Sequence, residues 1–264
     1  MNTEPARRRS VWPRGRSRPG VAIDLGSART RVWTSDAGLV ADAPTVSSFR
    51  DELNHPVRRG SIVDPEGVAW LLRHLLHGTG TLGARPGILV LTMPALCTAA
   101  DRAAGLSAAE VLDPATVLTV DGVKAAAIGA NADFSGPQLV VDFGAHLTEV
   151  ALLCEGSVSA ASCTAIGTSD LAGSVTTTTL VEVVLDMVSG LLRTDCGPQI
   201  VDALDTGPVL TGGGSLRPAI VYQLSKRLSC QVRPAPRPHT AAVRGAAQLV
   251  LAAHRHPSSS LRRT

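Results

Sequence analysis

The sequence is poor in aromatic residues and in lysine. Phe, Trp and Tyr make up only 3% of the 264 residues, while hydrophobic residues make up 44%. We therefore expect cores built from Val, Leu, Ile and Ala, and the chain is long enough for two of them. Only two of the 25 basic residues are lysines, Lys124 and Lys226, so arginine carries almost all of the positive charge.

Cysteines and long apolar runs are also scarce. The five cysteines are an odd number without C-x-x-C spacing. This argues against a disulfide framework or a zinc site and is typical of reduced thiols. No apolar stretch reaches the roughly 20 residues of a membrane span, and the N-terminus lacks the apolar segment of a signal peptide. We therefore expect a cytoplasmic protein.

The net charge of +3 is unevenly distributed along the chain. Residues 1–19 carry +5 and residues 254–264 carry +3, which leaves about −5 for the part between them. The folded part is therefore not expected to bind nucleic acid. We expect residues 1–19 to form a disordered basic tail and residues 254–264 to form a second basic tail. Trp12 lies inside the first arginine cluster, so this tail is either simply solvated or contacts an anionic membrane surface.

The chain contains an internal repeat, which organises the rest of the sequence. Residues 21–32 are typical of a strand, a glycine turn and a second strand, and residues 140–150 repeat this pattern 118 positions later. The matching pairs are Asp24 and Asp142, Gly26 and Gly144, Thr30 and Thr148, Val32 and Val150, and Gly38 and Gly156. Such turns expose backbone N–H groups that can bind phosphate, and an Asp at a strand end can hold Mg²⁺ through water. Two facing turns would therefore bind the phosphate chain of a nucleotide from both sides.

The remaining pattern predicts an α/β protein with two similar halves. Strands are expected at residues 20–25, 29–35, 44–49, 88–93 and 116–120, and again at 138–143, 147–154, 157–164, 209–211 and 231–234. Helices are expected after Asp64, Thr98, Thr176 and the glycine loop at 212–214, and at 124–129 and 239–253. Residues 55–60 are expected to be a short connection. Each half, 20–135 and 136–253, would form a mixed, mostly parallel sheet with helices on both faces. The helices at 121–131 and 239–253 would cross where the halves meet.

Four motifs resemble those of the actin-like ATPase superfamily, and within it the MreB-like bacterial actins. Residues 23–30 resemble the first phosphate loop, 141–150 the second, 210–216 the adenosine loop, and 125–129 the helix after the family's Glu-Pro-Met. The resemblance spans residues 20–250. It implies two duplicated ribonuclease-H-like domains, the inner subdomains IA and IIA, with a nucleotide cleft between them. It also implies ATP and Mg²⁺ as cofactors and a role in cell shape and cell-wall synthesis at the inner face of the membrane.

The resemblance also implies the site residues. The implied nucleotide-binding residues are Asp24, Gly26, Ser27, Thr30, Gly144, Thr148, Gly212, Gly213, Gly214 and Ser215. Asp24 and Asp142 would hold Mg²⁺ through water molecules. Arg29 and His146 depart from the family pattern in the two phosphate loops, and each would either contact phosphate or block the site.

The sequence departs more strongly from the family pattern at the catalytic position. The residue that aligns with the family's water-orienting Glu is Gly122. Asp121 is a candidate substitute, but a shift of one residue on a helix turns a side chain by about 100°. We therefore expect poor hydrolysis or none.

The chain is also about a fifth shorter than typical members of the family. Two connections are short, the one from the third strand to Arg59 and Gly60 and the one from Gly167 to Gly207. The resemblance places the outer subdomains of the family in these two connections. We expect a reduced MreB-like actin that binds ATP weakly and acts with a full-length MreB-type filament. The alternatives are an active ATPase that uses Asp121 or a water chain, and a nucleotide-free, membrane-associated adaptor.

Overall fold

The computed structural model describes residues 18–48, 53–77, 85–173 and 175–255. The expected tails at 1–19 and 254–264 lie outside the described residues, except for residues 18–19 and 254–255. None of the helices in the described ranges is long and apolar enough to cross a bilayer.

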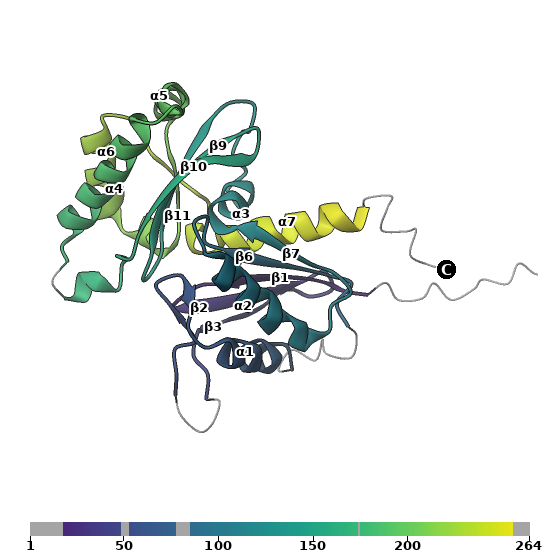
Figure 1. Cartoon of the computed structure of the whole chain (residues 1–264). Helices are drawn as coiled ribbons and strands as arrows, with labels where there is room; N and C mark the ends of the chain where they lie inside the picture. Colours follow the sequence, from purple (N-terminus) through teal and green to yellow (C-terminus); the bar gives the residue numbers. More distant parts are fainter. Residues whose placement is uncertain (1–17, 49–52, 78–84, 174, 256–264) are drawn as a thin grey trace, which may run out of the picture.

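Two five-stranded sheets form two lobes (Figure 1). The sheet of the first lobe has the order β3-β2-β1-β6-β7, and its strands are β1 (Gly20–Leu25), β2 (Arg29–Thr34), β3 (Gly38–Pro44), β6 (Ile88–Met93) and β7 (Val117–Asp121). The sheet of the second lobe has the order β10-β9-β8-β11-β12, and its strands are β8 (Gln138–Phe143), β9 (Thr148–Cys154), β10 (Ser157–Thr164), β11 (Val209–Thr211) and β12 (Arg233–Pro234). In the first sheet β1 pairs antiparallel with β2 and parallel with β6. In the second sheet β8 pairs antiparallel with β9 and parallel with β11. The predicted fold of two mixed sheets flanked by helices is therefore confirmed.

Helices cover the outer face of each sheet. In the first lobe these are α1 (Pro65–His77) and α2 (Ala99–Ala109), and in the second lobe α4 (Thr177–Leu192), α5 (Gly197–Thr206) and α6 (Pro218–Leu228). The expected caps are present: Thr98 accepts a hydrogen bond of 3.0 Å from the N–H of Asp101, and Thr176 one of 3.0 Å from that of Thr179. Both cores are almost entirely aliphatic, as the composition predicts.

Two helices, α3 (Gly122–Gly129) and α7 (Ala241–Arg255), lie between the lobes and cross there as expected (Figure 1). A Cβ on Gly129 would overlap the carbonyl oxygen of Ala241, and one on Gly245 would overlap that of Ala125. Backbone therefore packs directly on backbone at the crossing. Each helix also packs against the sheet of the opposite half: α7 covers β1 and β6, and α3 covers β8 and β11. The two lobes are thus interlocked.

Three local expectations were wrong. The third strand was expected at 44–49 but runs from Gly38 to Pro44, because Gly38, at a φ of +78°, closes a tight turn soon after β2 ends. The expected connection at 55–60 contains β4 (Val57–Arg58), which pairs with β5 (Ser61–Ile62) as a hairpin. Helix α5, which begins with Pro198 in its first turn, was not expected at all.

Candidate functional site

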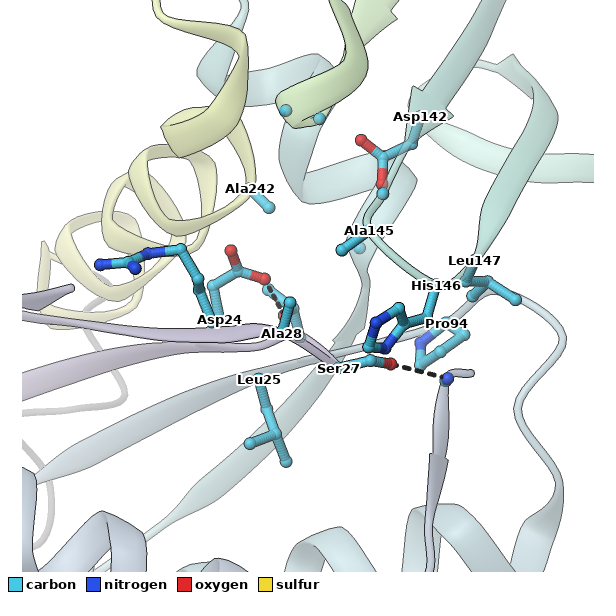
Figure 2. Close-up of a pocket in the computed structure, with 18 of the residues that line it drawn as sticks. Asp24, Leu25, Ser27, Ala28, Pro94, Asp142, Ala145, His146, Leu147 and Ala242 are labelled. Carbon is cyan, nitrogen blue, oxygen red and sulfur yellow. Dashed lines mark hydrogen bonds between the residues drawn. The ribbon is translucent and has the colours of Figure 1, made fainter. Parts of the chain in front are cut away.

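A cavity of about 220 Å³ lies between the two lobes (Figure 2). Both glycine turns reach it, as do the ends of β1, β6 and β8. The residues of the predicted site that line it are Asp24, Gly26, Ser27, Asp142, Gly144, Gly212 and Gly213. Five further residues named from the sequence do not line it, namely Thr30, Thr148, Gly214, Ser215 and Asp121.

Asp24 and Asp142 lie on opposite walls of this cavity (Figure 2). Asp24 accepts a hydrogen bond of 3.0 Å from Thr92 and forms an ion pair of 3.4 Å with Arg31. Burial nevertheless raises the pKa of Asp24 above its usual value, because it outweighs the opposing effect of Arg31. Burial also raises the pKa of Asp142 to about 6, and the negative charge of Asp24 adds to this rise. The two carboxylates thus repel each other across a poorly solvated gap, where a cation would stabilise both.

The two glycine turns have the same hydrogen bond. The N–H of Gly26 donates to the carbonyl of Arg29 at 3.1 Å, and the N–H of Gly144 donates to that of Leu147 at 3.0 Å. A Cβ on Gly26 would lie 2.8 Å from the Arg29 oxygen, so a side chain there would disturb the turn. Four backbone N–H groups of the turns make no hydrogen bond within the described part of the chain, those of Ser27, Ala28, Ala145 and His146. We call them the turn N–H groups, and they are free to donate to an anion.

Of the four binding residues predicted in the adenosine loop, Gly212 and Gly213 line the cavity and Gly214 and Ser215 do not. Gly212 has a φ of +79°, and Gly213 has open space where a Cβ would be. Gly214 is buried against Phe143, and the Ser215 hydroxyl donates a 2.6 Å hydrogen bond to the carbonyl of Thr211.

Thr30 and Thr148 are buried behind the turns. The Thr30 hydroxyl lies 2.8 Å from that of Thr45, and the Thr148 hydroxyl donates to the carbonyl of Ile166 at 2.8 Å. Both threonines therefore hold the turns in place rather than reaching the cavity.

Asp121 does not line the cavity, whereas Gly122 does. The Asp121 carboxylate pairs with Arg102 at 3.8 Å. The carboxylate one residue before Gly122 is therefore engaged by Arg102 and does not line the cavity.

Glu149 is a further residue of the site that was not expected from the sequence. Glu149 lies on β9 with 6% of its surface exposed, and it lines the cavity. Its carboxyl group accepts a 2.9 Å hydrogen bond from the N–H of Ala95 in the other lobe. Burial, followed by the charge of Asp142, raises the pKa of Glu149 to about 8, so this side chain keeps its proton at neutral pH. The available signal was an acidic residue inside an otherwise apolar strand.

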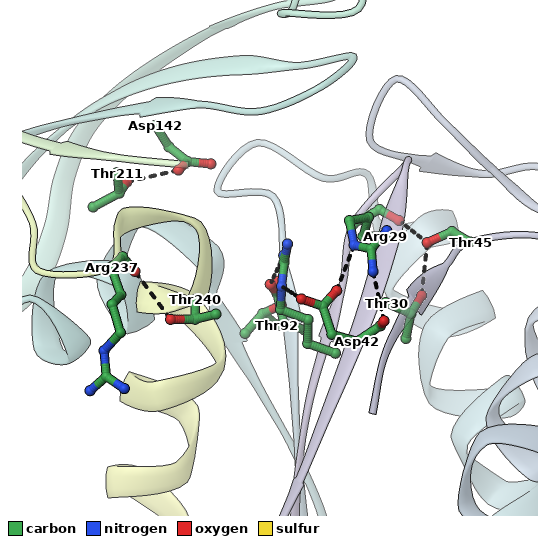
Figure 3. A network of polar contacts seen from close by, with 12 residues as sticks. Arg29, Thr30, Asp42, Thr45, Thr92, Asp142, Thr211, Arg237 and Thr240 are labelled. Carbon is green, nitrogen blue, oxygen red and sulfur yellow. Dashed lines mark hydrogen bonds and ion pairs between the residues drawn. The ribbon is translucent and has the colours of Figure 1, made fainter. Parts of the chain in front are cut away.

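Two arginines of β2 form a network with Asp42 on β3 (Figure 3). Arg29 pairs with Asp42 at 2.6 Å, and Arg31 lies 3.2 Å from Asp42 while also pairing with Asp24. Burial alone would raise the pKa of Asp42, but the hydrogen bond from Arg29 and the charge of Arg31 hold it below its usual value. The Arg29 guanidinium is thus engaged by Asp42 at the rim of the cavity. His146, the other departure from the family pattern, lies on the cavity wall (Figure 2).

The β4–β5 hairpin connects the lobes beside the cavity. Arg59 pairs with Asp170 of the second lobe at 3.0 Å and also donates to the carbonyl of Ala165. The N–H of Gly60 donates to the Ser27 hydroxyl at 2.9 Å. The hairpin therefore bounds one side of the cavity.

The donor set fits a phosphate chain with a hydrated cation. In the described part of the chain, no group of three or more His, Cys, Asp or Glu side chains is arranged to enclose a metal directly. Two facing carboxylates with raised pKa values suit an Mg²⁺ ion that keeps most of its waters. The turn N–H groups suit phosphate oxygens.

Comparison with known proteins agrees with this geometry. A family profile described as MreB/Mbl protein matches residues 52–177. The cell shape-determining protein MreB of Escherichia coli K12 is 26% identical in an alignment of 186 positions that covers 58% of this chain and 53% of that protein. MreB of Pasteurella multocida is 26% identical in an alignment of 179 positions that covers 56% of this chain and 51% of that protein. The chain thus spans about half the length of the curated relatives it matches.

Solved structures show the same fold. MreB5 of Spiroplasma citri bound to ADP superposes with a TM-score of 0.76 at 16% identity, covering 91% of this chain and 99% of that one. The MamK double helical filament gives a TM-score of 0.71 at 18% identity, covering 91% of this chain and 100% of that one. The motifs, the fold and these matches agree: the chain is similar to the bacterial actins of the MreB/Mbl family and shares their fold, and it is shorter than full MreB.

Proposed function

We propose that this protein is a reduced cytoskeletal actin that binds Mg·ATP weakly and hydrolyses it poorly or not at all. It would act in cell shape and cell-wall synthesis by joining filaments of a full-length MreB-type partner. The observation that carries the proposal is the pair Asp24 and Asp142, which face each other across a cavity bounded by two matching phosphate-type turns. Related structures of MreB5 bound to ADP and to AMPPNP support a nucleotide at this site.

Calorimetric titration with ATP, with and without Mg²⁺, tests the binding. We expect Mg-dependent heat from the wild type and none from Asp24→Asn, because one half of the carboxylate pair has lost its charge. Absence of heat from the wild type would favour the nucleotide-free adaptor.

Poor hydrolysis follows from Gly122. A Cβ at this position would meet only the Met93 carbonyl oxygen, at 3.5 Å, so the backbone has room for a side chain. Gly122→Glu should therefore increase phosphate release from Mg·ATP, since a well-placed base typically contributes about 10²–10⁴-fold. Gly122→Gln is the control, because it has the same shape but cannot accept the proton. Phosphate release by the wild type that disappears in Asp121→Ala would instead support an active ATPase.

Assembly with a partner is tested by co-sedimentation. We expect this protein to pellet with a full-length MreB in the presence of Mg·ATP and to stay in the supernatant alone. The support is the similarity to MreB together with the filament formed by the structural relative MamK. Robust pelleting without a partner would contradict the co-assembly role.

We also propose that the basic tail holds the protein at the inner face of the membrane. Residues 1–19 carry +5, and cations near an anionic surface each contribute about 1 kcal/mol. Deletion of residues 1–19 should abolish flotation with anionic liposomes and leave the folded part intact by circular dichroism. Unchanged flotation would show that the tail is only solvated.

A further inference from the structure

We infer that the cavity recognises a magnesium-bound phosphate chain and gains almost no affinity from the nucleoside attached to it. This inference rests on the proposed function, since it names what the same site selects. Its basis is the size of the cavity, the chemistry of its walls, and the burial of Gly214 and Ser215 of the adenosine loop in the second lobe.

The cavity is small and has few surfaces for a base. Its volume of about 220 Å³ lies below the roughly 300–1,000 Å³ of pockets that enclose whole small ligands. Among the described residues that line it, none is Phe, Tyr or Trp. Aliphatic side chains form a large part of the wall, and its polar part consists of glycine backbone, hydroxyls, carboxylates, two arginines and two imidazoles. These polar groups suit phosphate oxygens and hydrated Mg²⁺ rather than an aromatic ring.

The adenosine loop offers little to a base. Gly214 and Ser215 are buried within the second lobe, and the Ser215 hydroxyl is committed to the Thr211 carbonyl. The next side chain, Leu216, is 57% exposed. The part of the loop that faces the cavity consists of Gly212 and Gly213, whose backbone can approach a ligand but whose lack of side chains leaves no surface to stack on.

Two imidazoles add donors for phosphate, from His146 and His239. The segment before His239 is fixed, because the Pro238 carbonyl accepts a 3.1 Å hydrogen bond from Gly212. The Nδ1 atom of His239 is enclosed without a hydrogen-bond partner in the described part of the chain. Such a ring nitrogen in a residue that lines the cavity is the reason to expect His239 to contact a ligand.

The charge of the walls makes the cation necessary. Asp24 and Asp142 face the cavity, where burial weakens the screening of their charges by water. The two arginines that also line it are engaged by carboxylates, Arg29 by Asp42 and Arg31 by both Asp24 and Asp42. A phosphate chain without Mg²⁺ would be repelled by the two carboxylates. In a magnesium-bound chain the positive charge of Mg²⁺ offsets their negative charges. Binding should therefore depend on Mg²⁺ and on the phosphates together.

Calorimetry on the full chain tests this with three probes: Mg·ATP, Mg·methyl triphosphate, which has the same triphosphate ester but no nucleoside, and adenosine alone. We expect the first two to bind within about threefold of each other, because less than 1 kcal/mol then comes from the nucleoside. Adenosine should give no heat. Affinity for Mg·ATP more than about tenfold above that for Mg·methyl triphosphate would overturn the inference and leave the proposed nucleotide site standing. If neither triphosphate binds, both fail.

A matched pair of variants tests the contribution of the imidazole. His239→Ala should weaken binding of Mg·ATP and of Mg·methyl triphosphate by the same factor, roughly fivefold or more, because the lost donor serves the phosphates. His77→Ala, at the exposed end of α1, is the control and should change neither. A loss confined to Mg·ATP would place His239 at the nucleoside and contradict the inference.

Discussion

The hydroxyl of Thr211 donates a 2.7 Å hydrogen bond to the carboxylate of Asp142, which lies directly opposite it in the register of β11 and β8. The first lobe repeats this relationship, because Thr92 on β6 donates to Asp24 on β1 at 3.0 Å and is its register partner. The duplication therefore includes not only the acids but also the groups that orient them. Each hydrogen bond favours the charged form of a carboxylate whose pKa burial raises.

Removing either hydroxyl should weaken cation binding. We expect Thr92→Val and Thr211→Val each to lower the affinity for Mg·ATP by about three- to tenfold, because a hydrogen bond to a charged group contributes roughly 1.5–3 kcal/mol, part of which water replaces. Competition titration across a range of Mg²⁺ concentrations measures this. The exposed Thr116→Val is the control. An equal loss of affinity for all ligands with no change in Mg²⁺ dependence would show a purely structural role.

Replacing one acid of the pair should stabilise the empty protein. Asp142→Asn removes a buried charge and its repulsion with Asp24, so the melting temperature without ligand should rise by about 2–4 °C per kcal/mol gained. The same variant should lose the further rise that Mg·ATP gives to the wild type. Asp186→Asn, on the exposed face of α4, should leave both values unchanged. A lower melting temperature in Asp142→Asn would show that the carboxylate is needed for folding.

The proton on Glu149 should make stability depend on pH. The folded state holds this proton up to about pH 8, whereas the unfolded chain releases it near the usual glutamate pKa of 4.5. Between these values the folded state binds more protons, so the free energy of unfolding should fall as pH rises, by up to ~1.4 kcal/mol per pH unit. Glu149→Gln keeps an acceptor for the N–H of Ala95 but has no proton to lose.

Urea unfolding at several pH values measures this difference. Stability of Glu149→Gln relative to the wild type should increase steadily from pH 5 to pH 8. Glu110→Gln, at an exposed position, should follow the wild type throughout. Parallel profiles for Glu149→Gln and the wild type would refute the retention of a proton by Glu149 in the folded state.

Two glycines offer a matched test of the helix crossing. Gly129→Ala puts a Cβ into the backbone of α7 and should destabilise the protein by more than the usual 1–3 kcal/mol of overpacking, because neither backbone can move alone. Gly190→Ala, in α4, meets nothing within 4 Å and should stabilise by about 0.5–1 kcal/mol. Thermal melts of both variants decide the question. Equal stability of the two would mean that the helices can separate freely.

The repeat explains what could be predicted from the sequence. The turns at Gly26 and Gly144 were located because Asp, Gly and Thr recur at one offset, and all the strands of the second half were expected within two residues. The same offset matches Gly38 with Gly156, and both glycines have a positive φ at the end of a turn. The third strand was nevertheless expected at 44–49, because the local pattern was followed there and the repeat was not.

Other features depend on contacts that no local pattern contains. The pairing of Thr92 with Asp24 arises from the register of two strands far apart in the chain. The exchange of α3 and α7 between the sheets is likewise a property of packing, since the small residues at their crossing do not indicate which sheet each helix covers. Glu149 was passed over because the sequence does not show which face of β9 meets the other lobe.

The crossing of α3 and α7 has a mechanical consequence for the site. Since Gly129 and Gly245 bring two backbones together without intervening side chains, sliding of one helix along the other is blocked by the neighbouring residues. The motion that this crossing leaves open to the lobes is a rotation about it. A single angle would therefore set the distance between Asp24 and Asp142, and any ligand that draws these two carboxylates together would turn the lobes as rigid bodies.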